Sequence, residues 1–221
     1  MADLILKDVV YRYPGGKRDI LRGINVEFPA GKVTAVCGRS GAGKSTMLYL
    51  LAGLDVPKSG EILYRGTPLT KRMLDNYRRK EAATIAQSYL LFPTRTVLEN
   101  VEYPLRMAGV DKEAARKEAC EHLSAVGIGE EMHRRLPTRL SGGEQQRVAI
   151  ARCLATHSNV IAADEPTGNL DEENAESVIE LLLELAHTQQ KTIIVVTHDT
   201  FIAQRCDLRM RLKNGLLEPM D

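Results

Sequence analysis

Residues 38–46 read GRSGAGKST, which fits the pattern Gly-x-x-x-x-Gly-Lys-Ser/Thr. The apolar residues 33–37 come directly before this stretch and predict a buried strand, and a helix is expected to begin at Lys44. A glycine-rich turn between a strand and a helix places bare backbone N–H groups where they can surround a phosphate. An incidental glycine turn is the alternative, but the strand before it and the helix after it favour a phosphate-binding loop in an α/β fold.

The residues of this loop have separate expected roles. Gly38, Gly41 and Gly43 let the backbone wrap around a phosphate. Lys44 is expected to reach the β- and γ-phosphates of ATP, and the Ser45 hydroxyl is expected to bind Mg²⁺. The residues predicted to contact the nucleotide are Gly38, Arg39, Ser40, Gly41, Ala42, Gly43, Lys44, Ser45 and Thr46.

Two adjacent carboxylates end a second apolar strand, in the stretch VIAADE at residues 160–165. The carboxyl end of a strand is where an open α/β sheet places its ligands. We expect Asp164 to hold Mg²⁺ through its water shell, and Glu165 to orient or deprotonate the water that attacks the γ-phosphate. The alternative for Glu165 is a solvated loop residue, which we would favour if the phosphate loop were absent.

Gln87 and His198 also follow strand-like runs, ATIAQ and TIIVVT. Both residues therefore have positions from which a side chain can face the same γ-phosphate. A single glutamine or histidine is more often a structural residue, and the spacing alone does not separate the two interpretations.

Tyr13 stands before a Pro-Gly turn, where an exposed ring can stack on adenine. Tyr11 is the competing candidate, because its alternation with Tyr13 also fits two side chains on one face of a half-buried strand. The bare sequence leaves both interpretations open.

The stretch LSGGEQQR at residues 140–147 places two glycines at the start of a patterned helix. Ser141 and Glu144 have the spacing of a capping box, which would explain a helix start. Gly142 and Gly143 nevertheless weaken that helix, since each glycine costs about 1 kcal/mol relative to alanine. We therefore expect that something approaches the backbone closely at this point.

Composition limits the possible functions. The chain has 221 residues, 43% of them apolar, and a formal net charge of +1, so it can bury a core but no overall field favours nucleic acid. It has no apolar run of about 18 residues and no signal-peptide pattern, so we expect it neither to span a membrane nor to be exported. Its four cysteines lie far apart and are expected to be packing residues rather than zinc ligands.

The order of these motifs is specific: Tyr13, GRSGAGKST, Gln87, LSGGEQQR, VIAADE, GNLD at 168–171, and His198. It closely resembles the nucleotide-binding subunit of ATP-binding cassette (ABC) transporters over essentially the whole chain. The resemblance implies an α/β fold with a RecA-like P-loop NTPase core, an antiparallel β subdomain and an inserted α-helical subdomain. In this single nucleotide-binding domain, residues 1–87 and 158–221 would form the core and β subdomain, and residues 88–157 the helical subdomain.

The resemblance also implies roles for individual residues. Gln87 and His198 become γ-phosphate sensors, with Gln87 also a Mg²⁺ ligand, and Tyr13 becomes the adenine platform. Two subunits of the family pair head to tail, so residues 141–144 of one subunit would close over the γ-phosphate at Lys44 of the other. These contacts comprise Ser141, Gly142, Gly143 and Glu144. Asp171 would lie in the loop that crosses between subunits.

A finer likeness involves TVLENVEYPLRMAGV at residues 96–110 and DEPTGNLD at residues 164–171. These stretches are similar to those of macrolide exporters, lipoprotein-releasing complexes, antimicrobial-peptide exporters and the cell-division ABC protein. The likeness implies a separate transmembrane permease subunit, a second nucleotide-binding subunit, and a location at the cytoplasmic face of the membrane. A second copy of this chain is the expected partner, but the sequence does not distinguish a homodimer from a heterodimer. Residues 89–92 would receive a cytoplasmic helix of the permease, although ordinary packing explains that apolar cluster equally well.

Glu144 and Ala86 depart from the usual pattern of the family, in which glutamine and an aromatic residue are commoner. Both departures bear on the efficiency of ATP hydrolysis more than on membership of the family. Three functions remain: an ATPase that drives export or extraction of a peptide, lipid or drug, an ATP-driven signalling or cell-division protein, and a soluble ATPase acting on nucleic acid. Neutral charge and a single cassette argue against the third, so no nucleic-acid partner is expected.

Overall fold

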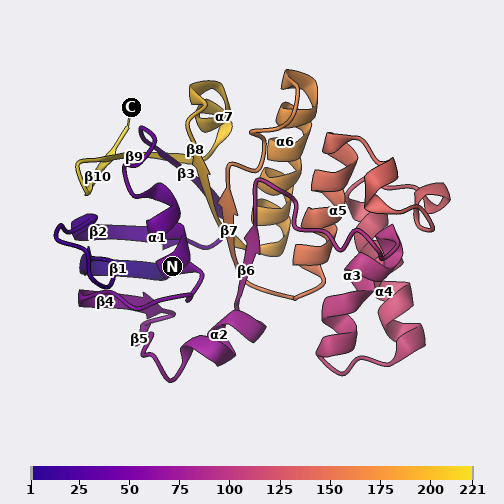
Figure 1. The fold of residues 1–221 in the computed structure, drawn as a ribbon, viewed down its shortest axis with the longest axis horizontal. Helices are drawn as coiled ribbons and strands as arrows, with labels where there is room; N and C mark the ends of the chain where they lie inside the picture. Colours follow the sequence, from indigo (N-terminus) through magenta and orange to yellow (C-terminus); the bar gives the residue numbers. More distant parts are fainter. Residues whose placement is uncertain (1, 221) are drawn as a thin grey trace.

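The computed structural model describes residues 2–220, which form two β-sheets and a group of helices (Figure 1). The larger sheet has the strand order β10-β9-β3-β8-β7-β6. Its strands are β3 (Lys32–Cys37), β6 (Ala82–Ile85), β7 (Val160–Asp164), β8 (Thr192–Thr197), β9 (Leu208–Lys213) and β10 (Leu216–Pro219). All of its neighbouring strands are parallel except β10, which pairs with β9 in the antiparallel sense. The expected α/β fold is confirmed, with a larger sheet that is mainly parallel.

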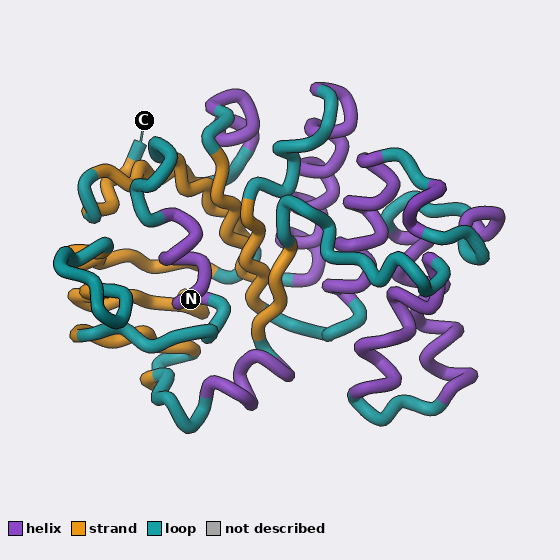
Figure 2. The backbone as a smooth tube through the Cα atoms, in the orientation of Figure 1, coloured by secondary structure: helices purple, strands orange, loops and turns teal. Residues whose placement is uncertain are grey.

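The smaller sheet is antiparallel and has the order β2-β1-β4-β5. Its strands are β1 (Ala2–Tyr11), β2 (Leu21–Pro29), β4 (Ser59–Tyr64) and β5 (Thr67–Pro68). Helix α1 (Lys44–Leu51) lies between the two sheets (Figure 2). Its apolar residues Met47 and Leu50 are buried in one cluster with Phe28 of β2 and Val36 of β3. This burial fixes the start of α1 next to the end of β3.

Helices cover the other face of the larger sheet. They are α6 (Glu172–Gln189) and α7 (Thr200–Arg205), followed outward by α5 (Gly142–Leu154), α3 (Val97–Met107) and α4 (Lys112–Ala125). One continuous apolar cluster runs from the sheet through α5 and α6 to α3 and α4. A separate helical subdomain at residues 88–157 stays a prediction, because this apolar cluster joins the helices of that segment to the larger sheet.

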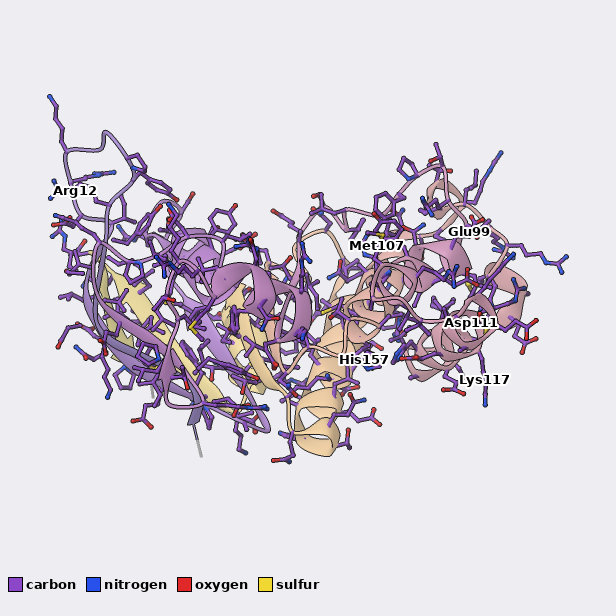
Figure 3. The ribbon with its side chains drawn as sticks, turned by 90° about the horizontal axis from the view of Figure 1, so that it is seen from below. Arg12, Glu99, Met107, Asp111, Lys117 and His157 are labelled. Carbon is purple, nitrogen blue, oxygen red and sulfur yellow. The ribbon has the colours of Figure 1, made fainter. Side chains whose placement is uncertain are left out.

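The remaining short elements are α2 (Leu74–Lys80), which leads into β6, and two single-turn helices, η1 (Glu130–Met132) and η2 (Pro137–Arg139), ahead of α5. Figure 3 shows how elongated the molecule is, with Arg12 at one end and Glu99 and Asp111 at the other. Within residues 2–220, no helix is both long and apolar enough to cross a membrane.

The expected capping box at the start of α5 is confirmed. The Ser141 side chain accepts a hydrogen bond from the Glu144 N–H, and the Glu144 carboxylate accepts one from the Ser141 N–H at 2.7 Å. Helix α3 begins with a second capping box, formed by Thr96 and Glu99. Both helices therefore begin at a defined residue, since each cap satisfies two N–H groups that the helix itself leaves unpaired.

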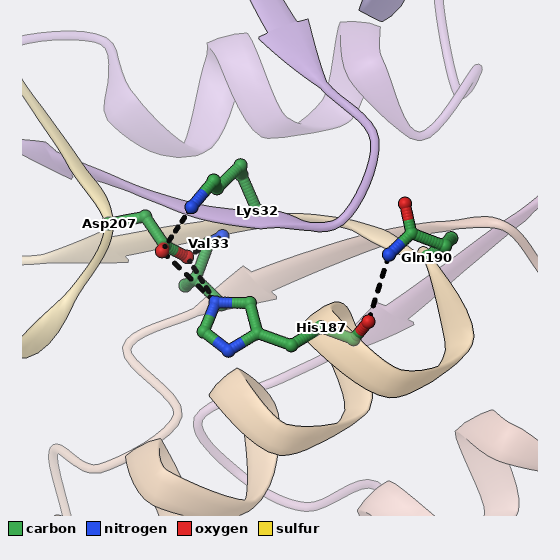
Figure 4. A network of polar contacts seen from close by, with 5 residues as sticks. All are labelled: Lys32, Val33, His187, Gln190 and Asp207. Carbon is green, nitrogen blue, oxygen red and sulfur yellow. Dashed lines mark hydrogen bonds and ion pairs between the residues drawn. The ribbon is translucent and has the colours of Figure 1, made fainter. Parts of the chain in front are cut away.

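A polar network joins three elements at the edge of the sheet opposite the phosphate loop (Figure 4). The Asp207 carboxylate accepts hydrogen bonds from the Val33 N–H at 2.8 Å and from Lys32 Nζ at 2.9 Å. It also contacts His187 Nε2 of α6 at 3.0 Å. Gln190 Nε2 donates to the His187 carbonyl at 2.9 Å and closes the helix end. The network ties α6 to the starts of β3 and β9.

Candidate functional site

The phosphate loop leaves the carboxyl end of β3 and enters α1, as expected. Gly41 and Gly43 have left-handed backbones, with φ of 74° and 103°. A Cβ on Gly43 would lie 2.8 Å from Ile20 Cγ2, and a Cβ on Gly38 would lie 2.6 Å from the Leu212 carbonyl oxygen. These glycines are therefore required by backbone conformation and by close packing.

Lys44 is the first residue of α1, and its side chain reaches back across the loop. It is only 7% exposed, and its Nζ donates to the carbonyls of Gly38 at 2.9 Å and Arg39 at 3.3 Å. Its ammonium group is thus held beside the loop N–H groups, where the positive end of the helix also lies. This arrangement suits a triphosphate, because cationic and N–H donors converge on one small volume.

A pocket of about 640 Å³ opens over this loop. Its walls are Tyr13, Ile20, Ser40, Gly41, Gly43, Lys44, Ser45, Thr46, Glu165 and His198. The structure therefore brings together residues from four separate predicted stretches. Gly38, Arg39 and Ala42 instead line a second hollow of about 920 Å³ on the other side of the loop, which also contains His198.

The two tyrosines near the pocket have different environments. Tyr13 is 44% exposed, and its hydroxyl lies 2.7 Å from the Thr46 hydroxyl at the start of α1. Tyr11 is only 5% exposed, and burial together with a hydrogen bond to Asp55 raises its pKa to about 12. The rings meet edge to face with centroids 5.1 Å apart. Only Tyr13 of the pair lines the pocket, so Tyr11 supports it from behind.

Glu165, His198 and Gln87 converge at the carboxyl ends of the parallel strands. Glu165 Oε1 lies 3.0 Å from His198 Nδ1. A Cβ on Gly168 would lie 3.0 Å from Gln87 Nε2 and 3.3 Å from Glu165 Oε2, which places both side chains around one point. The Gln87 carbonyl accepts a hydrogen bond from Asn169 Nδ2 at 2.9 Å. The two strand-end predictions thus fall at one location.

Asp164 ends β7 directly before Glu165 and is paired with Val196 of β8. It is half-buried and lies outside the residues that line the 640 Å³ pocket. Its position one residue from Glu165 at the same edge is the one the sequence predicts. Its role in Mg²⁺ binding stays a prediction.

The glycines at the start of α5 are approached closely by side chains of the same chain. A Cβ on Gly143 would lie 2.6 Å from Asn174 Oδ1, and a Cβ on Gly142 would lie 3.0 Å from the Tyr89 hydroxyl. The expectation of a close approach is met here by packing between α5, α6 and the loop after β6. Glu144 turns its carboxylate to the Ser141 N–H, so its charge is engaged in its own helix cap.

Residues 141–144 and Asp171 do not join the pocket formed by their own chain. Asp171 is the N-cap of α6 and accepts a hydrogen bond from the Asn174 N–H at 2.9 Å, which lowers the pKa of its carboxyl group. Ser141 is exposed and Asp171 is exposed. The predicted site residues therefore form two groups, one at the phosphate loop and one at the starts of α5 and α6.

Sequence reasoning missed several residues of these two groups. Ile20 lines the pocket beside Gly43, and Asn174 contacts both Gly143 and Asp171. Ile20 belongs to an irregular loop with no motif, so no sequence signal identifies it. Asn174 carries only the weak signal of a polar residue three positions after a helix cap.

Comparison with known proteins identifies the family. The family described as ABC transporter matches residues 21–168 of this chain. The ABC transporter ATP-binding protein YclH of Bacillus subtilis is 40% identical over 215 residues, covering 97% of this chain and 95% of the relative. The lipoprotein-releasing system ATP-binding protein LolD of Hydrogenovibrio crunogenus is 41% identical over 224 residues, covering 97% of this chain and 96% of the relative.

Solved structures of ABC transporter cassettes are similar to this chain. The dimeric ABC transporter cassette MJ0796 has a TM-score of 0.86 and 36% identity, covering 99% of both chains. Another structure of MJ0796, with the same similarity, is a post-hydrolysis state bound to ADP and phosphate. The RecA-like P-loop fold and ATP hydrolysis expected from the sequence are therefore confirmed at the level of the family. This chain belongs to the ABC transporter family, as one of its ATP-binding proteins, and it is an ATPase.

Proposed function

We propose that this protein works as a head-to-tail pair of identical cassettes that drives a separate membrane permease at the cytoplasmic face of the membrane. The observation that carries the proposal is the division of the site. Lys44 and Glu165 border one pocket, whereas Ser141 and Asp171 are exposed elsewhere on the same chain. A second copy that faces the first would bring the two groups together twice, at two equivalent sites.

ATP would be held at the pocket over the phosphate loop. The loop fits a triphosphate because Gly38 and Gly43 lack a Cβ, which would clash with the Leu212 carbonyl oxygen and with Ile20. The backbone can therefore make the tight turn in which its N–H groups would surround a phosphate. Lys44 would exchange its bonds to the Gly38 and Arg39 carbonyls for bonds to phosphate oxygens. Tyr13 would stack its exposed ring on the adenine.

Mg²⁺ would be bound by the Ser45 hydroxyl, the Gln87 side chain and, through water, Asp164. These hard oxygen donors suit Mg²⁺, and they come from the end of β7, the end of β6 and the start of α1. When bound, the ion would neutralise charge on the transferred phosphate.

Glu165 would act as the base that orients and deprotonates the attacking water. Its Oε1 contact with His198 Nδ1 at 3.0 Å fixes both side chains, so that the imidazole can sense the γ-phosphate while the carboxylate faces the water. Gln87 Nε2 lies at the same point, near Gly168, where it would monitor the same phosphate.

The start of α5 would close over the ATP of the facing chain. Ser141 offers an exposed hydroxyl, and the N–H groups of Gly142 and Gly143 lie at a helix N-terminus, which favours an anion. Glu144 would contribute through its cap, and Asp171 through the loop between the subunits. The dimeric form of the MJ0796 relative supports this arrangement. Cleavage of the γ-phosphate would remove the charge that both faces share and loosen the pair.

The permease would dock at residues 89–92. Beside them lies a hollow of about 340 Å³ whose walls include Leu54, Phe92, Tyr103 and Arg152. Leu90 is 63% exposed, whereas Phe92 packs edge to face on Tyr103 with ring centroids 4.9 Å apart. Part of the cluster is therefore subdomain packing, and part is an apolar surface available to a partner.

The work that ATP drives would be export or extraction of a peptide, lipid or drug. The similarity to LolD, a lipoprotein-releasing system ATP-binding protein, favours a lipid-modified protein among these. Signalling or cell-division activity on a membrane partner without transport is the alternative, because the same ATPase would drive either. A soluble activity on nucleic acid is disfavoured by the formal net charge of +1.

The test is a crosslink between facing chains. Glu165→Gln, which removes the base, is combined with Ser141→Cys and Ser40→Cys, and the protein is oxidised with MgATP. We expect a covalent dimer that forms with ATP and not with ADP, and slowed hydrolysis with retained ATP binding, since a general base contributes about 10²–10⁴-fold. Adding Lys44→Ala is the control and should abolish the crosslink. A chain that stays monomeric with ATP, alone and with its permease, would contradict the proposal.

A further inference from the structure

The loop that follows Gln87 has an unusual backbone. Tyr89 and Leu90 are consecutive non-glycine residues in the left-handed region, with φ of 59° and 49°. Such residues are strained, and they persist only where the surroundings fix them. Figure 1 shows this segment, between β6 and α3, passing beside α5 and α6.

Arg152 of α5 provides that fixation. One guanidinium nitrogen donates to the Leu90 carbonyl at 2.7 Å, and the other donates to the Tyr89 carbonyl at 3.1 Å. The guanidinium carbon also lies 5.9 Å from the centroid of the Phe92 ring. A planar fork with fixed donors can grip two successive carbonyls, whereas an ammonium group cannot do so with the same geometry.

The same loop touches the other end of α5. The Tyr89 hydroxyl lies 3.0 Å from the position a Cβ would take on Gly142, the first residue of the helix. Arg152 stands near the last residue of that helix, Leu154. The loop therefore lies against both ends of α5: Arg152 binds its backbone near the C-terminal end, and the Tyr89 side chain lies close to Gly142 at the N-terminal end.

We propose that Arg152 is a positioning residue, which holds Gln87 at the carboxyl end of β6 and joins it mechanically to the helix that begins at Ser141. The inference rests on the proposed function, in which Gln87 serves its own ATP and Ser141 serves the ATP of the facing chain. Arg152 contacts neither nucleotide. It links the two sites within one chain, because a shift of α5 moves the two carbonyls that follow Gln87.

The test compares Arg152→Met with Arg147→Met. Arg147 is a matched control: it lies on the same helix and donates to the Val126 carbonyl at 3.1 Å and to Ser177, but not to the loop after Gln87. Two measurements are made on the full chain: hydrogen exchange of the amides of residues 88–92 without nucleotide, and steady-state hydrolysis of MgATP.

We expect Arg152→Met to raise exchange at residues 88–92 by roughly tenfold or more, because both hydrogen bonds from the guanidinium to the loop are lost and one charged hydrogen bond alone is worth about tenfold. It should lower kcat by a similar factor while KM for ATP changes less than about twofold, since Lys44 and Tyr13 are untouched. Arg152→Lys should fall between Arg152→Met and the parent, because lysine can reach one carbonyl. Arg147→Met should leave exchange at residues 88–92 and the kcat at the parent values.

The proposal is overturned if exchange at residues 88–92 is the same in Arg152→Met and the parent, or if Arg147→Met lowers kcat as much as Arg152→Met does. It is also overturned if Arg152→Met raises KM and leaves kcat intact. Exchange is measured without ATP, so it tests the contact between Arg152 and the loop independently of hydrolysis. The proposed function depends on hydrolysis by the parent chain, so the two ideas can fail separately.

Discussion

Replacing Gly143 by alanine separates two explanations for the glycines at the start of α5. One explanation is packing within the chain, because a Cβ on Gly143 would lie 2.6 Å from Asn174 Oδ1 and 2.9 Å from Asn174 Cγ. The other is a surface kept bare for the ATP of a facing subunit. The first predicts a change in stability without nucleotide, and the second predicts a change only in the ATP-bound pair.

The structure sets the size of the stability change. Alanine gains at most about 1 kcal/mol over glycine in a helix. Overpacking typically costs about 1–3 kcal/mol, and here the Asn174 side chain must rotate away from the Asp171 carboxylate, to which its Nδ2 donates at 2.9 Å. We expect Gly143→Ala to lower the free energy of unfolding by about 1–2 kcal/mol. Asn174→Ala removes the side chain that the new Cβ would meet. In that background, Gly143→Ala should be neutral or stabilising.

The assay is a double-mutant cycle of urea unfolding curves without nucleotide, compared at equal slope. The packing argument is refuted if Gly143→Ala does not destabilise the parent, or if it lowers the free energy of unfolding as much in the Asn174→Ala background as in the parent. The stable double variant is then placed in the Glu165→Gln background and given MgATP. If it unfolds like the parent yet forms no dimer, the bare backbone of Gly143 serves the facing subunit as well.

The remaining predictions concern Lys44, Tyr13 and Asp207. Lys44→Ala should weaken ATP binding roughly tenfold to a hundredfold, since a charged contact contributes about 1.5–3 kcal/mol; unchanged affinity by calorimetry would contradict its role. Tyr13→Ala should weaken ATP binding by a similar factor and Tyr13→Phe much less, because stacking needs only the ring; equal losses in a nucleotide titration would point to the hydroxyl instead. Burial alone would raise the pKa of Asp207, but hydrogen bonds from Val33, Lys32 and His187 outweigh it and hold the pKa below its usual value. A lowered folded-state pKa contributes stability above the unfolded value near 3.9, which is lost as the pH falls through the folded value. Asp207→Asn should therefore be less stable than the parent at pH 7, and the difference in free energy of unfolding should shrink as the pH falls below about 4 toward the lower folded-state pKa.

The phosphate loop and its surroundings were predictable because their chemistry is local. A compact strand, three glycines with fixed spacing and a lysine at the helix start follow from the sequence alone, and the structure places them as β3, the loop and α1. Both strand ends that carry Gln87 and His198 were also predictable, since parallel strands end at one edge. The capping box of Ser141 needed only a spacing of three residues.

Long-range packing explains what the sequence did not reveal. The strand β9 pairs with β3, which lies far earlier in the chain. Its pattern LRMRLK alternates apolar and basic residues strictly, so it indicates a strand but not the strand that it pairs with. Whether Tyr11 or Tyr13 is exposed depends on Asp55, a residue in another loop. The closeness of Asn174 to Gly143 is a contact between two helices, so the sequence indicated a close approach but not the residue that makes it.

Glu165, the proposed base, has a left-handed backbone that is unfavourable for a glutamate. Its φ is 45°, a conformation that costs a non-glycine residue about 1–2 kcal/mol, and its N–H donates to the Val196 carbonyl at 2.9 Å, which fixes the turn. Asparagine adopts this conformation more readily than glutamate. We expect Glu165→Asn to raise the free energy of unfolding by about 0.5–1 kcal/mol while removing hydrolysis, because asparagine carries a neutral amide in place of the carboxylate that would activate water. If the variant were instead less stable than the parent, the 3.0 Å contact between Glu165 and His198 would stabilise the turn more than the backbone strain opposes it, and the strain would carry no functional meaning.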